Sequence, residues 1–265
     1  MSEQDYLENY NMSTICYYVD GHDHSSVRAS SRRGERKYFK ITTDRDLRDI
    51  FFTCTQLSIR HAKRMNNYEL SDARLIVGRV RDSYDRDADQ FPIEYVGGSR
   101  ADHEPNVTVK GEGVNKRGEY IAMVEIDWKD ERLINDFVFR TYCADPVDIE
   151  EITEYQAGDF MKNALSDCAH KNTELTTFES RGYPDIGMSN DLNVCKAGYS
   201  FIYVENNNRY KAVRLKFMLT DYDAITFDED LSRGHPMVVQ PGHSESIVMK
   251  NDHNRKSFFR LAYNV

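Results

Sequence analysis

A loop of closely spaced aspartates offers the clearest opportunity for metal chemistry. Calcium takes about six to eight oxygen ligands, and clustered carboxylates in a loop can supply them. The segment "DSYDRDADQ" follows an apolar run but lacks the glycine and the terminal glutamate of an EF-hand, and Arg81 and Arg86 neutralise part of its charge. The pattern favours a solvated acidic loop. A calcium site stays open as the alternative, with the ligands Asp82, Asp85, Asp87 and Asp89.

A cysteine and a histidine two residues apart are the nearest approach to a nucleophile with its base. Cys168 and His170 occur in "SDCAH", but residues at i and i+2 do not face one another on a helix. The chain also contains no glycine-rich phosphate loop, no Gly-x-Ser-x-Gly elbow and no zinc-protease motif. We therefore expect no catalytic residues, no enzymatic activity and no cofactor apart from calcium in the alternative above.

A short basic run stands out in an acidic chain. The 265 residues carry a net charge of −9, which argues against general nucleic-acid binding because phosphate contacts need an excess of Lys and Arg. No apolar run approaches the length of a membrane helix, so we expect a cytoplasmic protein without a membrane span. The basic run is typical of a solvated loop, and it is the candidate for a local contact with an acidic protein partner. Its residues are Arg28, Arg32, Arg33, Arg36 and Lys37.

Short runs of β-branched and aromatic residues, separated by turn residues, dominate both halves of the chain. Examples are "KYFKIT", "YIAMVEIDW" and "GYSFIYVEN". Their spacing of about 8 to 12 residues predicts a mainly β fold, with two antiparallel β-sandwich domains in tandem. The expected parts are a first sandwich at 1–153, a connector at 154–190 with room for a short helix capped by Asp159, and a second sandwich at 191–265. A start of the second sandwich near residue 155 is the alternative boundary.

Several of these runs resemble a known family. In "DIFFTCTQLSIR" an alternating strand ends at Gln56 and is followed by Arg60, and in "RGEYIAMVEIDW" a strand opens with Gly118 and Tyr120. This order resembles the calpain C2-like domain, the β-sandwich (domain III) that calpain large subunits carry behind their protease core. The runs "GYSFIYVEN" and "VVQPGHSESIVMKN" resemble a further sandwich in calpain-related proteins of ciliates.

The resemblance implies binding rather than catalysis, because the chain is too short to hold a papain-like protease core of about 300 residues as well. It implies a non-catalytic, structural protein-binding subunit, with a cilium or axoneme as its location and tubulin or other axonemal proteins as partners. A calcium-dependent membrane or lipid sensor is the alternative of another class.

The family signature residues are expected to be structural. Gln56 would satisfy open backbone groups where its strand leaves the core, and Arg60 would reach an acidic loop. Gly118 and Tyr120 would shape the start of their strand. Trp128, the sole tryptophan, is predicted to pack in the core or at a strand end.

Overall fold

The fold is mainly β, with antiparallel sheets arranged as two sandwich-like units, as the sequence predicts. The computed structural model describes residues 22–57, 69–83, 91–101, 104–129, 134–172, 176–178, 183–189, 196–223, 225–227, 235–251 and 258–264. Within these ranges no helix is long and apolar enough to cross a membrane.

The first unit packs a four-stranded sheet, β1-β8-β3-β6, against a five-stranded sheet, β5-β4-β7-β2-β9. Side chains such as Phe39, Phe52 and Phe139 fill the core between the two sheets. The strands are β1 (Asp23–Ser31), β2 (Arg36–Thr43), β3 (Leu47–Gln56), β4 (Asp72–Val80), β5 (Ile93–Ala101), β6 (Asn106–Asn115), β7 (Gly118–Asp127), β8 (Asn135–Cys143) and β9 (Asp148–Ile152).

The second unit packs a five-stranded sheet, β10-β11-β12-β16-β14, against a three-stranded sheet, β15-β13-β17. Ile202, Leu215 and Met249 lie in the core between them. The strands are β10 (Thr176–Phe178), β11 (Tyr183–Ser189), β12 (Tyr199–Asn206), β13 (Val213–Asp223), β14 (Ile225–Phe227), β15 (His235–Val239), β16 (His243–Asn251) and β17 (Phe258–Asn264).

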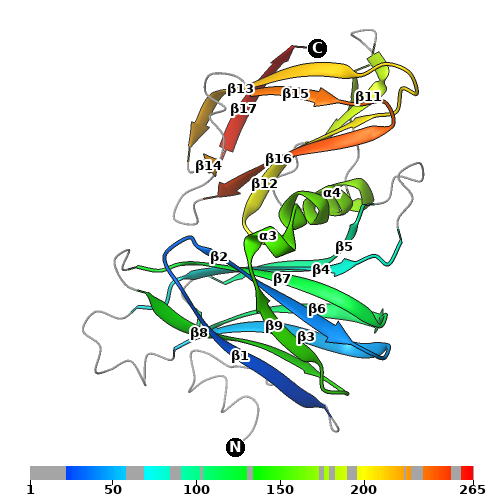
Figure 1. The fold of residues 1–265 in the computed structure, drawn as a ribbon. Helices are drawn as coiled ribbons and strands as arrows, with labels where there is room; N and C mark the ends of the chain where they lie inside the picture. Colours follow the sequence, from blue (N-terminus) through cyan, green and yellow to red (C-terminus); the bar gives the residue numbers. More distant parts are fainter. Residues whose placement is uncertain are drawn as a thin grey trace, which may run out of the picture.

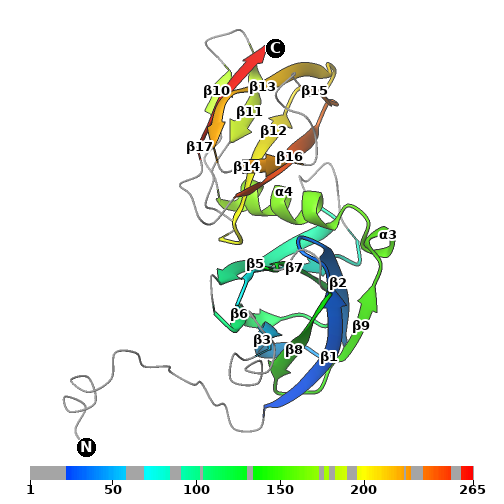
Figure 2. The same ribbon diagram turned by 90° about the vertical axis from the view of Figure 1, so that its left-hand side faces the viewer.

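A helical layer joins the two units (Figure 1). The short helix α3 (Glu154–Ala157) leads into α4 (Phe160–Asn172), and Figure 2 shows α4 between the β5 and β7 side of the first unit and β12 and β16 of the second. A further core gathers Ile76 and Met123 from the first unit, Leu165 from α4 and Phe201 from the second unit. The molecule is therefore built as sheet, sheet, helix, sheet and sheet.

The strands next to this helical layer are buried on both faces. In β7 the residues from Tyr120 to Ile126 are all buried, and every residue of β12 is buried. By contrast, β3 alternates between buried and partly exposed residues, as expected for a sheet with one covered face. The helix thus explains why "YIAMVEIDW" and "GYSFIYVEN" are nearly continuous apolar runs.

The expected connector at 154–190 is wrong in its extent. The strands β10 and β11 pair with β12, so the second unit begins at Thr176 and not at residue 191. The helices before it form a packed layer between the units instead of a loose link. The alternative start near 155 is too early, because α3 and α4 come before the first strand of the second unit. The helix α4 begins directly after Asp159, and capping by the Asp159 side chain stays a prediction.

Candidate functional site

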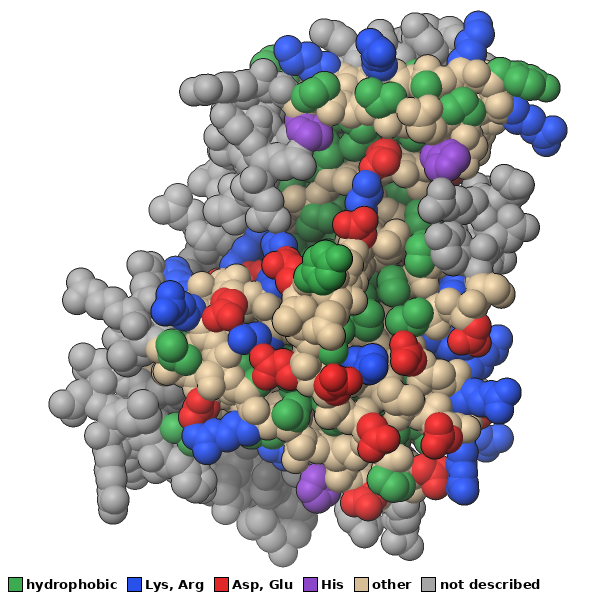
Figure 3. Space-filling model, in the orientation of Figure 1, with side chains coloured by type: hydrophobic (Ala, Val, Ile, Leu, Met, Phe, Trp, Pro, Cys, Tyr) green, Lys and Arg blue, Asp and Glu red, His purple; other side chains and the backbone are tan. Residues whose placement is uncertain are grey.

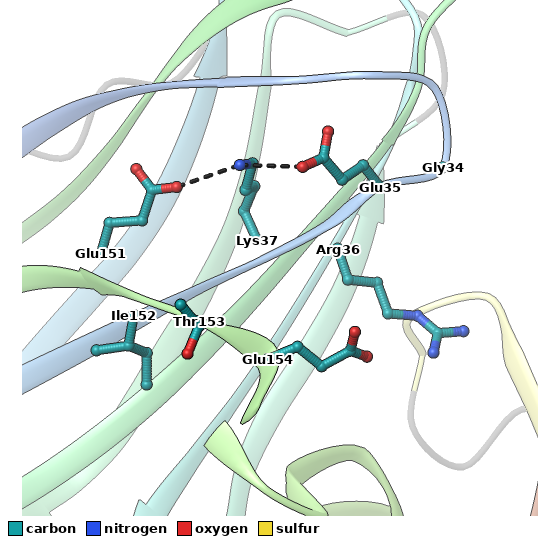
Figure 4. Close-up of a pocket in the computed structure, with 8 residues that line it drawn as sticks. All are labelled: Gly34, Glu35, Arg36, Lys37, Glu151, Ile152, Thr153 and Glu154. Atoms are coloured by element: carbon teal, nitrogen blue, oxygen red, sulfur yellow. Dashed lines mark ion pairs between the residues drawn. The ribbon is translucent and has the colours of Figure 1, made fainter. Parts of the chain in front are cut away.

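A charged surface pocket lies where the start of β2 meets the end of β9 (Figure 4). Its volume is about 760 Å³. We call it the β2–β9 pocket. Its walls come from two segments that are far apart in the sequence: Gly34, Glu35, Arg36 and Lys37 on one side, and Glu151, Ile152, Thr153 and Glu154 on the other. The antiparallel pairing of β2 with β9 brings them together.

The first wall is fixed by the tight turn between β1 and β2. Gly34 has a φ of 70°, a backbone conformation that side-chain-bearing residues rarely adopt. Its N–H donates to the carbonyl of Ile126 at 2.9 Å, which docks the turn onto β7. Within the turn, the backbone N–H of Arg32 donates to the Glu35 carboxylate at 2.8 Å. Backbone contacts therefore hold this wall in place.

The second wall is fixed by the cap of α3. The Thr153 hydroxyl accepts from the backbone N–H of Gln156, and the Gln156 side chain accepts from the backbone N–H of Thr153. This reciprocal capping box satisfies backbone donors that a helix start leaves open. The sequence contains this signature as "TEYQ", from Thr153 to Gln156.

The pocket holds paired charges. Lys37 Nζ lies 3.0 Å from Glu35 Oε1 and 3.3 Å from Glu151 Oε1. Partial burial disfavours the charged forms of Glu35 and Lys37, but hydrogen bonds outweigh this effect. The hydrogen bonds that Glu35 accepts from the Arg32 N–H and from Lys37 lower the pKa of Glu35 below its usual value. The hydrogen bonds that Lys37 donates to the two glutamates raise the pKa of Lys37. Both groups therefore stay ionised at neutral pH.

The other side of the pocket leads to the junction between the units. Arg36 Nε lies 3.1 Å from the buried carboxylate of Glu125, and Figure 4 shows Arg36 and Lys37 leaving β2 in different directions. The hydroxyl of Tyr38 donates to Glu154 at 3.4 Å. Burial, with the nearby Glu154 charge, holds the pKa of Tyr38 well above its usual value. Tyr38 thus stays a neutral donor beneath the pocket.

An exposed aromatic residue stands next to this pocket in the chain. Tyr155 follows the lining residue Glu154 on α3, and it is 94% exposed. A tyrosine offers a large contact area together with a hydroxyl, and tyrosines are enriched among residues that carry binding energy at protein interfaces. The pocket and Tyr155 together could accept a segment with both polar and apolar groups.

The lining residues show no pairing of a nucleophile with a base. They include neither Cys nor His, and the pocket's lysine is held protonated by two carboxylates. Across the part of the chain that the structure describes, no group of three or more His, Cys, Asp or Glu side chains is placed to hold a metal ion. The paired charges and hydrogen-bonding groups that line the pocket are suited to contacts with polar groups of a partner.

The residues of the predicted basic run do not form one continuous positive surface, because several of them pair with carboxylates. Arg28 lies on β1 and pairs with Asp136. Arg32 and Arg33 are exposed at the turn, whereas Arg36 and Lys37 reach carboxylates on separate sides of β2. The run therefore contributes its last two residues to the pocket, and partner binding by the run stays a prediction.

The predicted calcium loop lies mostly outside the described residues. Asp82 is described: its side chain is 88% exposed, and it lies 3.9 Å from Arg79. Asp85, Asp87 and Asp89 fall outside the described ranges, as does Arg60. Calcium binding and the contact expected for Arg60 therefore stay predictions.

The described signature residues lie in structural positions. Gln56 is buried, and its amide donates to the Ser71 carbonyl at 2.7 Å and accepts from the Ser71 N–H at 2.9 Å. It thus bonds open backbone groups at the end of β3, the role expected for it. Gly118, with a φ of 130°, begins β7, and the buried Tyr120 donates to the Lys116 carbonyl at 2.5 Å. Trp128 is buried in the core and donates to Ser31 at 2.9 Å.

Cys168 and His170 do not face one another. Cys168 is buried in the core beneath α4, while the His170 ring lies 3.5 Å from Glu205. The other described cysteines, Cys54 and Cys143, are also free and buried. Burial raises the pKa of the Cys143 thiol to about 11, and that of Cys54 well above its usual value. Neither of these two thiols is an activated nucleophile.

Sequence reasoning missed a buried cluster of ion pairs at the junction of the units, which we call the junction cluster. Arg74 is fully buried on β4, 2.7 Å from Asp72 and 2.5 Å from Asp127. From the second unit, Lys250 lies 2.6 Å from Asp127 and also pairs with Glu125. The only sequence signal is the presence of charged residues inside apolar runs such as "ARLIVGRV" and "MVEIDW".

Uncharged groups of the second unit also contact this junction cluster. The Arg74 guanidinium donates to the Asn251 carbonyl at 3.0 Å, and its carbon lies 5.9 Å from the centre of the Tyr199 ring. The Tyr199 hydroxyl donates to Glu125 at 2.8 Å. Burial, reinforced by the charge of Glu125, keeps the pKa of Tyr199 far above its usual value. Both units therefore supply partners to the same buried charges.

The two aspartates of the junction cluster respond differently to their surroundings. Burial dominates at Asp72 and raises the pKa of its carboxyl despite the neighbouring Arg74 and Arg100. Burial acts in the same direction at Asp127, but Arg74 and Lys250 outweigh it and lower the pKa of that carboxyl. Asp127 is thus the carboxylate that the two units jointly stabilise in its charged form.

No known protein family and no curated protein matches the chain. Among solved structures, the vicilin of Corylus avellana (hazelnut) is similar at a TM-score of 0.20 and 8% sequence identity, over 91% of this chain and 74% of that chain. A similarity this weak carries no argument about fold or function.

Proposed function

We propose that this protein is a non-catalytic, structural subunit that binds other proteins at the β2–β9 pocket. The observation that carries the proposal is Tyr155, which is 94% exposed directly beside a charged pocket with rigid walls. An exposed tyrosine on a fixed scaffold loses little conformational entropy when a partner covers it. The paired charges of the pocket supply hydrogen bonds that select polar groups of the partner.

The layered architecture suits such a role. Because α4 packs against sheets from both units, and the junction cluster links them as well, the pocket sits on one continuous body. A partner that binds at the pocket therefore meets a preformed surface, which lowers the cost of association.

The resemblance to calpain C2-like domains supports a more specific version of this proposal. It suggests a calpain-related protein of the cytoskeleton in a cilium, with tubulin or axonemal proteins as partners and without nucleic acid, membrane or cofactor. A fluorescently tagged chain should then follow the axoneme in ciliated cells. A diffuse cytoplasmic signal would contradict the location and leave pocket binding to be tested separately.

Site-specific photo-cross-linking in the native cell tests the pocket. A benzoylphenylalanine at position 155 should give discrete cross-linked products, because a bound partner covers Tyr155. The same group at position 134 is the matched control, since Ile134 is also exposed, at 62%, but does not line the pocket.

A charge change in the pocket sharpens this test. Glu151→Lys should remove the products at position 155 by reversing the sign of one wall, while the loss of one exposed ion pair costs about 0 to 1 kcal/mol and leaves the fold intact. Identical products at positions 155 and 134, or products that Glu151→Lys does not affect, would contradict binding at the pocket.

A further inference from the structure

The three-stranded sheet of the second unit has an uncovered face of distinctive composition. Along β13, Val213, Leu215 and Phe217 point into the core, whereas the residues between them are exposed. Along β15, Met237 and Val239 are buried in the same way. We call the exposed side the outer face. Its described residues are Arg214, Lys216, Met218, Pro236 and Val238, which are all exposed.

Basic and apolar side chains lie side by side on this outer face. The register pairs Arg214 with Val238 and Lys216 with Pro236 across the two strands. Paired residues of neighbouring strands point to the same side of a sheet, so a basic row on β13 runs along an apolar row on β15. Val238 is 44% exposed and Met218 39%, so both offer apolar area to a partner.

The loop before β13 extends the basic row. Arg209, Tyr210 and Lys211 are exposed, and Tyr210 reaches 88%. The loop and the strand thus present four basic side chains in succession, together with one exposed aromatic ring. The four are Arg209, Lys211, Arg214 and Lys216.

These four bases differ from comparable bases of the first unit. None of them forms an ion pair with another described residue, whereas Lys37, Lys40 and Lys110 each lie within 4.0 Å of a carboxylate. In Figure 3, basic and hydrophobic side chains lie over β13 and β15 at the top, while acidic ones are concentrated on the first unit below. In a chain of net charge −9, this face offers positive charge without an internal acidic counterpart among the described residues.

We propose that the outer face is a docking surface for an acidic polypeptide segment in extended conformation. Alternate residues of a strand are about 7 Å apart, so Arg214 and Lys216 match two carboxylates on alternate positions of an extended chain. The neighbouring row of Val238 and Pro236 on β15, together with Met218 at the end of the basic row, receives apolar side chains of the same segment. These basic groups, which pair with no described carboxylate, also steer an acidic partner toward the face over longer distances.

The shape of the face favours a polypeptide over other acidic ligands. The apolar groups lie flat on a sheet and half-exposed, so they are poorly placed to insert into a lipid bilayer. Single-stranded nucleic acid is held by successive aromatic rings, and among the described residues of the face and its loop only Tyr210 supplies one. This inference goes beyond the proposed function, because it concerns the second unit and does not depend on the pocket.

Fluorescence anisotropy with a labelled peptide of alternating glutamate and valine tests the proposal. The peptide should bind the full chain with an affinity that falls as salt is added. The double variant R214Q/K216Q should bind about tenfold more weakly, which corresponds to the loss of two modest charge contacts. The matched control K40Q/K110Q removes two bases that carboxylates already neutralise, and it should leave the affinity unchanged. Circular dichroism melts verify that both double variants fold.

Each other outcome overturns the proposal. It fails if the glutamate peptide does not bind, or if R214Q/K216Q binds it as well as the native chain does. It also fails if phosphatidylserine vesicles or an oligodeoxythymidine bind more tightly than the peptide and lose affinity in the same variant. Tyr155→Ala should leave peptide binding unchanged, so a loss in that variant alone would move the binding to the β2–β9 pocket and separate the two proposals.

Discussion

The junction between the two units has an apolar part and an ionic part, and the two are held together by different forces. In the apolar part, α4 buries Phe160, Leu165 and Cys168 against both sheets. In the ionic part, Arg74 and Lys250 converge on Asp127. Apolar contacts are non-directional and tolerate substitutions of similar volume, whereas ion pairs and hydrogen bonds require a fixed geometry. The apolar part therefore supplies adhesion, and the ionic part defines one relative position of the units.

The largest effect is expected from Arg74→Met, which removes the centre of the ionic part. Asp72, Glu125 and Asp127 would remain buried without this partner, and breaking a buried ion pair on one side costs about 3 to 5 kcal/mol. Denaturant unfolding followed by circular dichroism measures the change. The control Arg28→Met breaks an exposed ion pair and should cost about 0 to 1 kcal/mol. Equal costs in the two variants would show that the ionic part adds no stability.

Leu165→Ala probes the apolar part. The side chain is fully buried beneath α4, so its truncation should lower the free energy of unfolding by about 2 to 5 kcal/mol, toward the smaller end where the site can collapse. Leu165→Met keeps the volume and should cost less than about 1.5 kcal/mol. By comparison, Arg74→Lys should be poorly tolerated although it keeps the charge, because an ammonium cannot reproduce the forked geometry of guanidinium. If Arg74→Lys proves as mild as Leu165→Met, the distinction between the two parts is lost.

The sequence predicted the strands better than it predicted their surroundings. Alternation and β-branched content located β2, β3 and β12, because these signals are local. The double burial of β7 depends on a helix that comes more than thirty residues later, and no local pattern in "YIAMVEIDW" names that partner. The amphipathic signal of α4 is weak for the same reason, since the helix packs against sheets on two sides.

The candidate site was harder to predict than the fold, for a physical reason. The pocket combines residues 34–37 with residues 151–154, which meet only because β9 pairs with β2. The basic run was recognisable, but its charges could not be assigned without knowing where Glu125 and Glu151 lie. Gln56 is the contrasting case, because a polar residue that ends an alternating strand already suggests a backbone partner.

Gln56→Ala tests a buried polar contact that lies within one unit and carries no charge. It leaves the N–H and the carbonyl of Ser71 without their side-chain partner, so the free energy of unfolding should fall by about 1 to 3 kcal/mol. Trp128, buried in the first unit, reports this unfolding by its fluorescence. Thr53→Ala on the same strand is the control, since its hydroxyl contact is exposed and its loss should be nearly neutral. A loss of partner binding in a fully stable Gln56→Ala protein would instead indicate a functional site.

The smallest effect, and the one that separates the two parts of the junction by pH, is expected from Asp127→Asn. The folded-state pKa of Asp127 is below its usual value of 3.8 because Arg74 and Lys250 outweigh burial, so its contribution to stability is present above the unfolded pKa and is lost as the pH falls through the folded one. Asp127→Asn should therefore be less stable than the native chain near neutral pH, and the difference should shrink below about pH 4.

The raised pKa of Asp72 acts with the opposite sign, but it is common to both proteins and largely cancels in the difference. Leu165→Ala removes no titrating group, so its deficit should stay constant over the same range. Parallel pH profiles for the two variants would mean that the ionic part does not depend on the charge of Asp127.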